Sequence, residues 1–139
     1  MEECLFCKII NNEIPAYKVY EDDSILAFLD IHPMSKGHTL IVPKKHAKDI
    51  FDLDEETLKS ISAAAKKISQ KMKDGLGVDG VNLYHASGAF AEQTVFHFHL
   101  HIVPRRKDDT ICFTCAVIGK QNVSQEELKE TADKLKIER

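Results

Sequence analysis

The stretch HFHLHIV, residues 97–103, places a histidine at every second position, namely His97, His99 and His101. Because successive side chains of a β-strand point to opposite faces, the three imidazoles would share one face and the apolar residues between them the other. Imidazoles two residues apart on a strand lie about 7 Å apart, so they can line one groove. The pattern predicts a strand over Val95–Val103, ended by Pro104, with its apolar face in the core.

Three histidines in strict alternation are hard to obtain by chance in a chain with seven, although a single strand histidine is usually just a polar surface residue. Two kinds of chemistry fit the pattern. Histidines two residues apart can chelate zinc or another transition metal, but this stretch contains no carboxylate to complete such a site. A neutral imidazole can instead attack phosphorus, if one ring nitrogen is free and the other is held as N–H by an acceptor such as a backbone carbonyl. A neighbouring imidazolium can then stabilise the phosphate oxygens.

The sequence on both sides of this stretch predicts an α+β fold. The clearest helix runs from Asp54 to Asp74, where apolar residues recur at three and four positions and form one stripe. Ser124 with Glu127 begins a C-terminal helix. The other predicted elements are a short helix at Leu5–Ile10 and strands at Tyr17–Tyr20, Ile25–Leu29, His38–Val42 and Val81–Tyr84. We therefore expect an antiparallel sheet of about five strands, one long helix and a C-terminal helix.

The composition is that of one ordinary globular domain, so we expect a single domain over residues 1–139. Hydrophobic residues make up 43% and charged residues 29% of the chain, which is a normal balance for one buried core. The formal net charge of -3 does not favour nucleic acid as a partner. No secretory signal pattern is present at the start, and the apolar runs are too short to span a membrane. The sequence thus predicts a cytoplasmic protein with no nucleic-acid or membrane partner.

The four cysteines form two Cys-x-x-Cys pairs, Cys4/Cys7 and Cys112/Cys115. In a reducing compartment such pairs indicate metal binding or redox chemistry more than structural disulfides. Two thiolates on one short turn suit zinc, which needs two further ligands. All four cysteines can make such a site, as can Cys4 and Cys7 with two histidines. Buried thiols that bind nothing are the plain alternative, and a thioredoxin-like role is disfavoured because no βαβ unit follows Cys7.

Residues 97–103 match at every position the histidine triad motif, in which histidine alternates with apolar residues. The sequence resembles the histidine triad (HIT) family, and within it the bacterial members of the Hint-like branch. Further blocks of resemblance follow in the same order along the chain, at residues 4–10, 28–31, 37–44 and 93–95. The resemblance covers most of the chain up to Arg106. It implies the HIT-like fold and a homodimer whose two sheets join.

The resemblance also implies a role for each histidine. The middle one, His99, would be the nucleophile, and it would form a covalent nucleotidyl-histidine intermediate that water hydrolyses to a nucleoside monophosphate. His101 would bond the α-phosphate. The backbone carbonyl of His97 would orient the nucleophilic ring. Gln93 and Thr94 stand at positions that contact phosphate or the leaving group.

Further residues correspond to a nucleotide pocket and a metal site. Asp30 stands where a residue holds the ribose hydroxyls, and a carboxylate accepting two hydroxyls is chemically sensible. An apolar slot for a purine base would be formed by Leu5, Phe6, Ile9, Phe28 and Ile31. Some related proteins bind a structural zinc through a Cys pair, the histidine after the Pro-Lys segment and the first triad histidine. By that correspondence the zinc ligands are Cys4, Cys7, His46 and His97.

The sequence departs from the family pattern in one loop, since Glu92 stands where glycine is frequent, and Ala86 and Ser87 stand where bacterial relatives often have asparagine. The implied activity is that of a nucleotide phosphoramidase or nucleotidyl hydrolase acting on purine nucleotides. Three alternatives compete with it. The protein would be a dinucleoside polyphosphate hydrolase, a nucleotide-binding regulatory module with little turnover, or a redox or metal-handling protein centred on the cysteine pairs.

Overall fold

The computed structural model describes residues 3–114 and 122–138. The chain divides into two compact units, Met1–Asp109 and Thr110–Arg139. Within the described residues, no helix combines the length and hydrophobicity needed to cross a bilayer. The expectation of a single domain over residues 1–139 stays a prediction.

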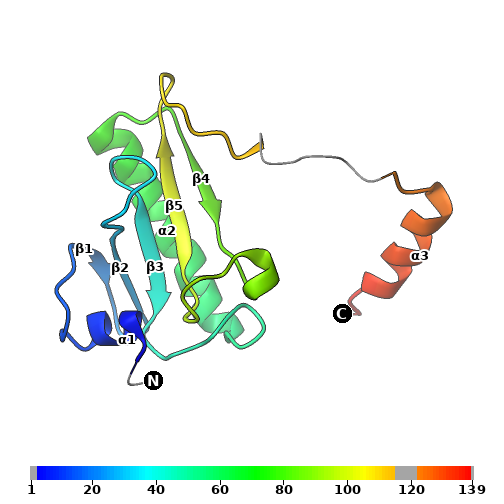
Figure 1. The fold of residues 1–139 in the computed structure, drawn as a ribbon, viewed down its shortest axis with the longest axis horizontal. Helices are drawn as coiled ribbons and strands as arrows, with labels where there is room; N and C mark the ends of the chain where they lie inside the picture. Colours follow the sequence, from blue (N-terminus) through cyan, green and yellow to red (C-terminus); the bar gives the residue numbers. More distant parts are fainter. Residues whose placement is uncertain (1–2, 115–121, 139) are drawn as a thin grey trace. The chain divides into compact units, whose positions relative to one another are not determined.

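The first unit is built on a five-stranded sheet with the strand order β1-β2-β3-β5-β4, in which every neighbouring pair is antiparallel (Figure 1). The strands are β1 (Lys18–Glu21), β2 (Ile25–Leu29), β3 (Thr39–Pro43), β4 (Gly80–Tyr84) and β5 (Leu100–Arg105). The helices are α1 (Leu5–Ile10), α2 (Glu55–Leu76) and, in the second unit, α3 (Gln125–Leu135), with a short 3-10 helix η1 at Ala89–Ala91. The predicted α+β class, with its antiparallel sheet, long helix and C-terminal helix, is confirmed.

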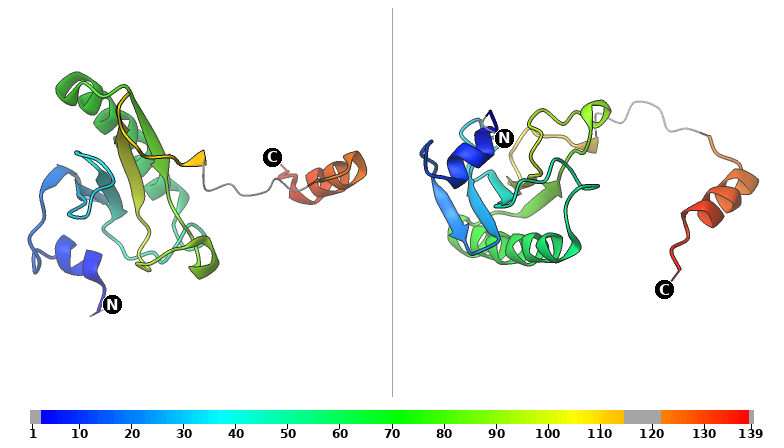
Figure 2. Two further views of the ribbon diagram at one scale, coloured as in Figure 1. Left: turned by 45° about the horizontal axis from the view of Figure 1, so that its top comes forward. Right: turned by 90° about the horizontal axis from the view of Figure 1, so that it is seen from below.

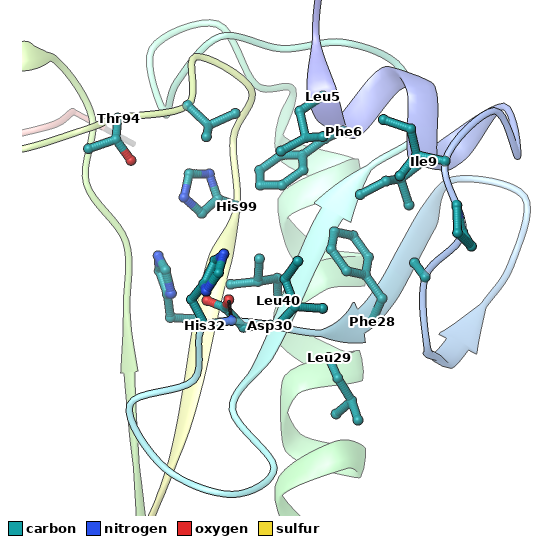
Figure 3. A pocket seen from close by; sticks show the side chains of 16 residues that line it. Leu5, Phe6, Ile9, Phe28, Leu29, Asp30, His32, Leu40, Thr94 and His99 are labelled. Carbon is teal, nitrogen blue, oxygen red and sulfur yellow. Dashed lines mark hydrogen bonds between the residues drawn. The ribbon is translucent and has the colours of Figure 1, made fainter.

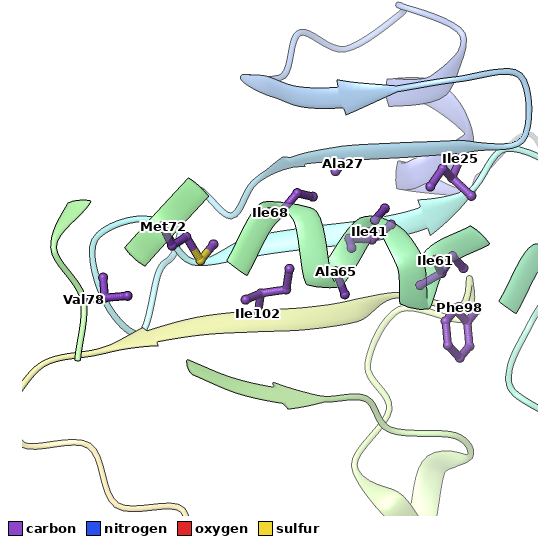
Figure 4. Packing of buried hydrophobic residues seen from close by; sticks show 11 residues of the cluster. Ile25, Ala27, Ile41, Ile61, Ala65, Ile68, Met72, Val78, Phe98 and Ile102 are labelled. Carbon is purple, nitrogen blue, oxygen red and sulfur yellow. The ribbon is translucent and has the colours of Figure 1, made fainter. Parts of the chain in front are cut away.

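Helix α2 begins and ends where local chemistry requires. The Asp54 side chain accepts a hydrogen bond from the Thr57 N–H and caps the first turn, and Gly77 ends the helix in the left-handed conformation at φ 61°. Its apolar stripe faces the sheet (Figure 4). The stripe packs on alternate residues of β2, β3 and β5, and the cluster includes Ile25, Ala27, Ile41, Ile61, Ala65, Ile68, Met72, Phe98 and Ile102. Each large side chain in it contributes about 1.5–3 kcal/mol through burial.

The short helix α1 covers the opposite face of the sheet from α2 (Figure 2, right). Because strand side chains alternate, the residues of β2 that do not face α2 face α1 instead. Phe6 and Ile9 of α1 pack on Leu26 and Phe28 of β2. The remaining members of this second cluster, Leu40 and Val42, come from β3. This second core fixes α1 against β2 and β3.

The predicted triad strand is partly wrong, because regular pairing begins only at Leu100. Residues 97–99 precede β5 and are held differently, since the Phe98 N–H donates to the Ala47 carbonyl at 2.7 Å. Pro43, the last residue of β3, has no N–H to offer to a continued ladder. Nor does Pro104 end the strand. The pairing of β5 with β3 stops at Ile102, whereas its pairing with β4 continues through Pro104 to Arg105.

The second unit contains α3, whose start follows the predicted capping box. The Ser124 side chain accepts from the Glu127 N–H, and the Glu127 side chain accepts from the Ser124 N–H. Residues 122–138 are all exposed. Cys115, the second half of the Cys112/Cys115 pair, lies outside the described residues.

Candidate functional site

His99 is held with one ring nitrogen engaged and the other available. Its Nδ1 lies 2.8 Å from the backbone carbonyl of His97. Because a carbonyl oxygen can only accept, Nδ1 carries the hydrogen and Nε2 of the neutral ring carries the lone pair. Burial lowers the pKa of His99, although the hydrogen bond to the His97 carbonyl opposes this effect. The ring is thus neutral near pH 7, in the tautomer that a nucleophile needs.

His101 is fixed in the complementary tautomer by a chain of two hydrogen bonds. The Met34 N–H donates to His38 Nδ1 at 3.0 Å, so His38, whose pKa burial lowers, carries its hydrogen on Nε2. His38 Nε2 lies 2.9 Å from His101 Nδ1 and therefore donates to it. His101 must then carry its own hydrogen on Nε2, and burial lowers its pKa to about 3. His101 Nε2 can therefore donate a hydrogen bond to a ligand in the pocket but cannot accept one.

These two histidines line a cavity of about 390 Å³, which is within the usual size range of small-molecule sites. In Figure 3, Phe6 lies on one side of His99 and Thr94 on the other. The ring of Phe6 meets that of His99 edge to face, with centroids 5.0 Å apart. The rest of the wall is largely apolar and includes Leu5, Ile9, Phe28, Leu29, Ile31 and Leu40. The predicted base-slot residues thus surround one cavity, with Ile31 at its exposed rim.

Asp30 is the carboxylate of this cavity and directly follows β2. Its Oδ1 accepts from the His32 N–H at 2.8 Å, which fixes the side chain. Its Oδ2 lies 3.7 Å from His38 Nε2. The cavity therefore combines an apolar wall, one carboxylate and three imidazoles, of which His99 and His101 have opposite hydrogen-bonding roles.

Gln93 does not line this cavity, and its side chain hydrogen-bonds the backbone of two loops instead. Its Oε1 accepts from the Gly88 N–H at 2.7 Å, and its Nε2 donates to the carbonyls of Lys48 and Val95. A contact between Gln93 and phosphate would cost one of these bonds. The neighbouring Glu92 is exposed and has a φ of 68°, a conformation that favours glycine. This backbone requirement gives a physical reason for the glycine that the resemblance leads us to expect at this position.

The predicted metal ligands come together at the start of α1. One donor atom each from Cys4, Cys7, His46 and His97 lies within 4.8 Å of the others. The separations from Cys4 Sγ to His97 Nδ1 and from Cys7 Sγ to His46 Nδ1 are both 3.4 Å, and that from Cys7 Sγ to His97 Nδ1 is 3.6 Å. Sulfur and nitrogen ligands of one tetrahedral zinc, at ~2.3 and ~2.0 Å from the metal, are about 3.5 Å apart. The four residues therefore fit a zinc ion.

The outer contact of His97 supports the same assignment. Its Nε2 lies 2.8 Å from the Pro43 carbonyl and must donate to it, which leaves the Nδ1 lone pair facing the two sulfurs. Burial lowers the pKa of His97 to about 4, so the ring is in the neutral state that a ligand requires. His97 thus turns its ring to the cysteines and its carbonyl to His99.

A second group, Asp30, His38 and His101, also brings three potential ligand atoms within 4.8 Å. It does not suit a metal, because His38 Nδ1 accepts from Met34 and Nε2 consequently bears a hydrogen. A metal at Nε2 would require the ring to lose its single N–H hydrogen, or Nδ1 to give up its bond from Met34. This group is better described as a hydrogen-bonded network.

The sequence did not identify two neighbours of His101. The sequence places His38 only at the start of a predicted strand, whereas in the structure it bonds the third triad histidine, and Tyr84 stacks on the same ring. The only available signal was strand register, since Tyr84 of β4 lies directly opposite His101 of β5. That register becomes visible only when the strands are paired.

Comparison with known proteins agrees with this geometry. The family model described as "HIT domain" matches residues 11–108. An uncharacterized HIT-like protein of Borreliella burgdorferi is 46% identical over 132 residues, 94% of each chain. The adenylylsulfatase HINT3 of Arabidopsis thaliana is 39% identical over 78% of this chain and 55% of its own. The structure of a Zn-bound histidine triad family protein from Mycobacterium smegmatis has a TM-score of 0.77 and 42% identity, over 81% of both chains. The residues that the family model matches include the three triad histidines and Asp30, and the chain belongs to the HIT family.

Proposed function

We propose that this HIT protein cleaves purine nucleoside phosphoramidates, or related nucleotides, at the α-phosphorus through a covalent bond to His99. One observation carries the proposal. The bond from His99 Nδ1 to the His97 carbonyl leaves the Nε2 lone pair of a buried, neutral imidazole at a cavity with a largely apolar wall. A neutral ring with this orientation is a competent nucleophile toward phosphorus.

The reaction consists of two displacements. The Nε2 lone pair attacks the α-phosphorus, and the bond to the leaving group breaks with its electron pair, which an amine neutralises by taking up a proton. Water then attacks the same phosphorus and releases a proton, which balances the proton that the amine takes up, while the bond to Nε2 breaks and its electron pair returns to the ring. In both steps negative charge accumulates on the phosphate oxygens. His101 Nε2–H, fixed as a donor by His38, can stabilise that charge.

The rest of the cavity would hold the nucleoside. The apolar wall around Phe6, Ile9 and Phe28 suits the faces of a purine, and the free oxygen of Asp30 suits a ribose hydroxyl. Thr94 lies at the His99 end of the cavity, near the leaving group in this placement (Figure 3). The contact of Gln93 with phosphate, expected from the resemblance, would require the loop to give up one of its hydrogen bonds, because the backbone N–H of Gln93 donates to the Gly88 carbonyl and its side-chain amide is also engaged.

Cys4, Cys7, His46 and His97 would hold a structural zinc. When bound, the metal supplies four protein bonds and has no position left for a substrate, so it would stabilise the fold and take no part in bond breaking. The Zn-bound relative from Mycobacterium smegmatis supports this assignment. A cytoplasmic homodimer is likewise part of the proposal, and light scattering of the purified protein would measure its mass.

The test compares one variant with the wild-type protein on a panel of substrates. His99→Ala should abolish turnover of adenosine phosphoramidate while adenosine monophosphate still binds, as measured by isothermal titration. Diadenosine polyphosphate and adenosine 5′-phosphosulfate, the latter suggested by the adenylylsulfatase relative, would rank the leaving groups. Mass spectrometry of the trapped wild-type enzyme should map the nucleotidyl adduct to His99. Full activity of His99→Ala would remove the mechanism, and binding without turnover in the wild-type protein would indicate a regulatory module.

A further inference from the structure

The phenol ring of Tyr84 lies flat against the imidazole of His101. The ring centroids are 4.2 Å apart and the ring planes differ by 2°. The two residues are directly opposed on the antiparallel strands β4 and β5, so their side chains rise from the same face of the sheet. A stack of this kind fixes the tilt of the imidazole plane, because any tilt would drive one ring edge into the phenol.

We propose that Tyr84 is a positioning residue that holds His101 with its Nε2–H directed at the phosphate. The inference rests on the proposed function, because it assigns a task to His101 in that reaction. Two contacts would together orient the His101 ring. The hydrogen bond from His38 fixes the rotation of the imidazole within its plane, and the stack on Tyr84 fixes the plane itself.

The contacts of Tyr84 also reach back to the residue that orients His38. The Tyr84 hydroxyl donates to the Met34 sulfur at 3.5 Å, and the Met34 N–H donates to His38 Nδ1. Tyr84, Met34, His38 and His101 therefore form a closed ring of contacts. Displacing one member loosens the others, which makes the orientation of His101 sensitive to a residue that does not line the cavity.

The stack has a further effect when His101 hydrogen-bonds an anion. The donor hydrogen gains positive character in the transition state, and an aromatic face beside the ring favours positive charge. Burial raises the pKa of Tyr84, so the phenol remains neutral and brings no competing charge. This interaction with the charge on His101 comes from the aromatic ring of Tyr84 and not from its hydroxyl. A phenylalanine at this position should therefore preserve most of it.

The experiment compares Tyr84→Leu with Tyr84→Phe on adenosine phosphoramidate. Tyr84→Leu should lower kcat on the order of tenfold with KM nearly unchanged, because the misplaced donor acts mainly in the transition state. Tyr84→Phe, which keeps the stack and loses only the hydroxyl contact with Met34, should retain most of the wild-type kcat. Leu83→Ala is the matched control, since Leu83 is the neighbouring, exposed residue of β4 on the opposite face. If Tyr84→Leu does not fold, Tyr84→Val, a good strand former, replaces it.

A second readout does not depend on turnover. Imidazole nitrogen NMR shifts should show His101 in a single Nε2–H tautomer in the wild-type protein and in Tyr84→Phe, and a mixture of tautomers in Tyr84→Leu. Wild-type kcat together with a single tautomer in Tyr84→Leu would overturn the inference. If the wild-type protein itself shows no turnover, the proposed function fails, and the NMR comparison alone decides the role of Tyr84.

Discussion

Replacing Asp30 by asparagine tests whether this carboxylate binds the ribose. Its Oδ1 is already engaged by the His32 N–H, and its side chain is 20% exposed beside the buried His38. A hydrogen bond to a charged acceptor contributes about 1.5–3 kcal/mol, compared with about 0.5–1.5 kcal/mol for a neutral one. For two ribose hydroxyls in a partly hydrated site, we expect a loss of about 2 kcal/mol, or roughly 30-fold in Kd.

The assay is isothermal titration with adenosine monophosphate and its 2′,3′-dideoxy analogue. The wild-type protein should bind the dideoxy nucleotide about 30-fold more weakly than the ribonucleotide, for the reason given above. Asp30→Asn should bind both nucleotides with nearly the same low affinity, because the group that distinguishes them is gone. Asp23→Asn, an exposed carboxylate in the turn between β1 and β2, is the control and should change neither affinity.

One result would refute the assignment of Asp30 to the ribose. If Asp30→Asn weakens binding of the dideoxy nucleotide as much as that of the ribonucleotide, Asp30 does not act through the hydroxyls. The residue would then act through its contact with His32 and the shape of the loop after β2.

Three other predictions concern stability and metal binding. Ile61→Ala should lower the free energy of unfolding by about 2–5 kcal/mol in urea titrations, because Ile61 is fully buried between α2 and the sheet, whereas Ser62→Ala on the exposed side of α2 should change it by less than about 0.5 kcal/mol. The pKa of His101 is about 3 in the folded protein and near 6.5 in an unfolded chain, so the unfolded state binds more protons between these pH values. The contribution of His101 to the free energy of unfolding should therefore be complete above pH 6.5 and decline as the pH falls below it. His101→Gln should flatten this decline, and an unchanged slope would contradict the burial of a neutral ring among His38, His99 and Asp30. Elemental analysis should find one zinc per chain, lost in the Cys4→Ser/Cys7→Ser double variant and retained in Cys112→Ser; retention in the former would exclude the proposed ligand set.

Much of the fold could be predicted because its signals are local. The caps at Asp54 and Ser124, the apolar stripe of α2 and the continuous apolar run of β2 each depend on neighbours within a few positions. These are the interactions that a sequence displays directly. The start of β5 depends instead on two distant groups, the Pro43 and Ala47 carbonyls, which replace the sheet ladder at His97 and Phe98. Alternation of residue types contains no information about them.

The site shows the same division. The triad pattern and the first cysteine pair led to residues that the structure brings together around one cavity and one cluster. The sequence did not predict the contacts of His38 and Tyr84 with His101, because these contacts depend on how β5 pairs with β3 on one side and with β4 on the other. The contact of Gln93 with phosphate or the leaving group was predicted from its position in the chain alone, whereas its side chain hydrogen-bonds the backbone of two loops.

The departure of His97 from the regular strand explains how one short segment serves two sites. If residues 97–99 continued the ladder of β5, the rings of His97 and His99 would point the same way, and a single groove would receive both. Turned as it is, His97 presents its ring to Cys4 and Cys7 and its carbonyl to His99. Helix α1 makes the same connection from the other side, since its cysteines face the cluster while Phe6 contacts His99. A helix of six residues has little stability of its own, so whatever fixes the cysteines also fixes one wall of the cavity beside the nucleophile.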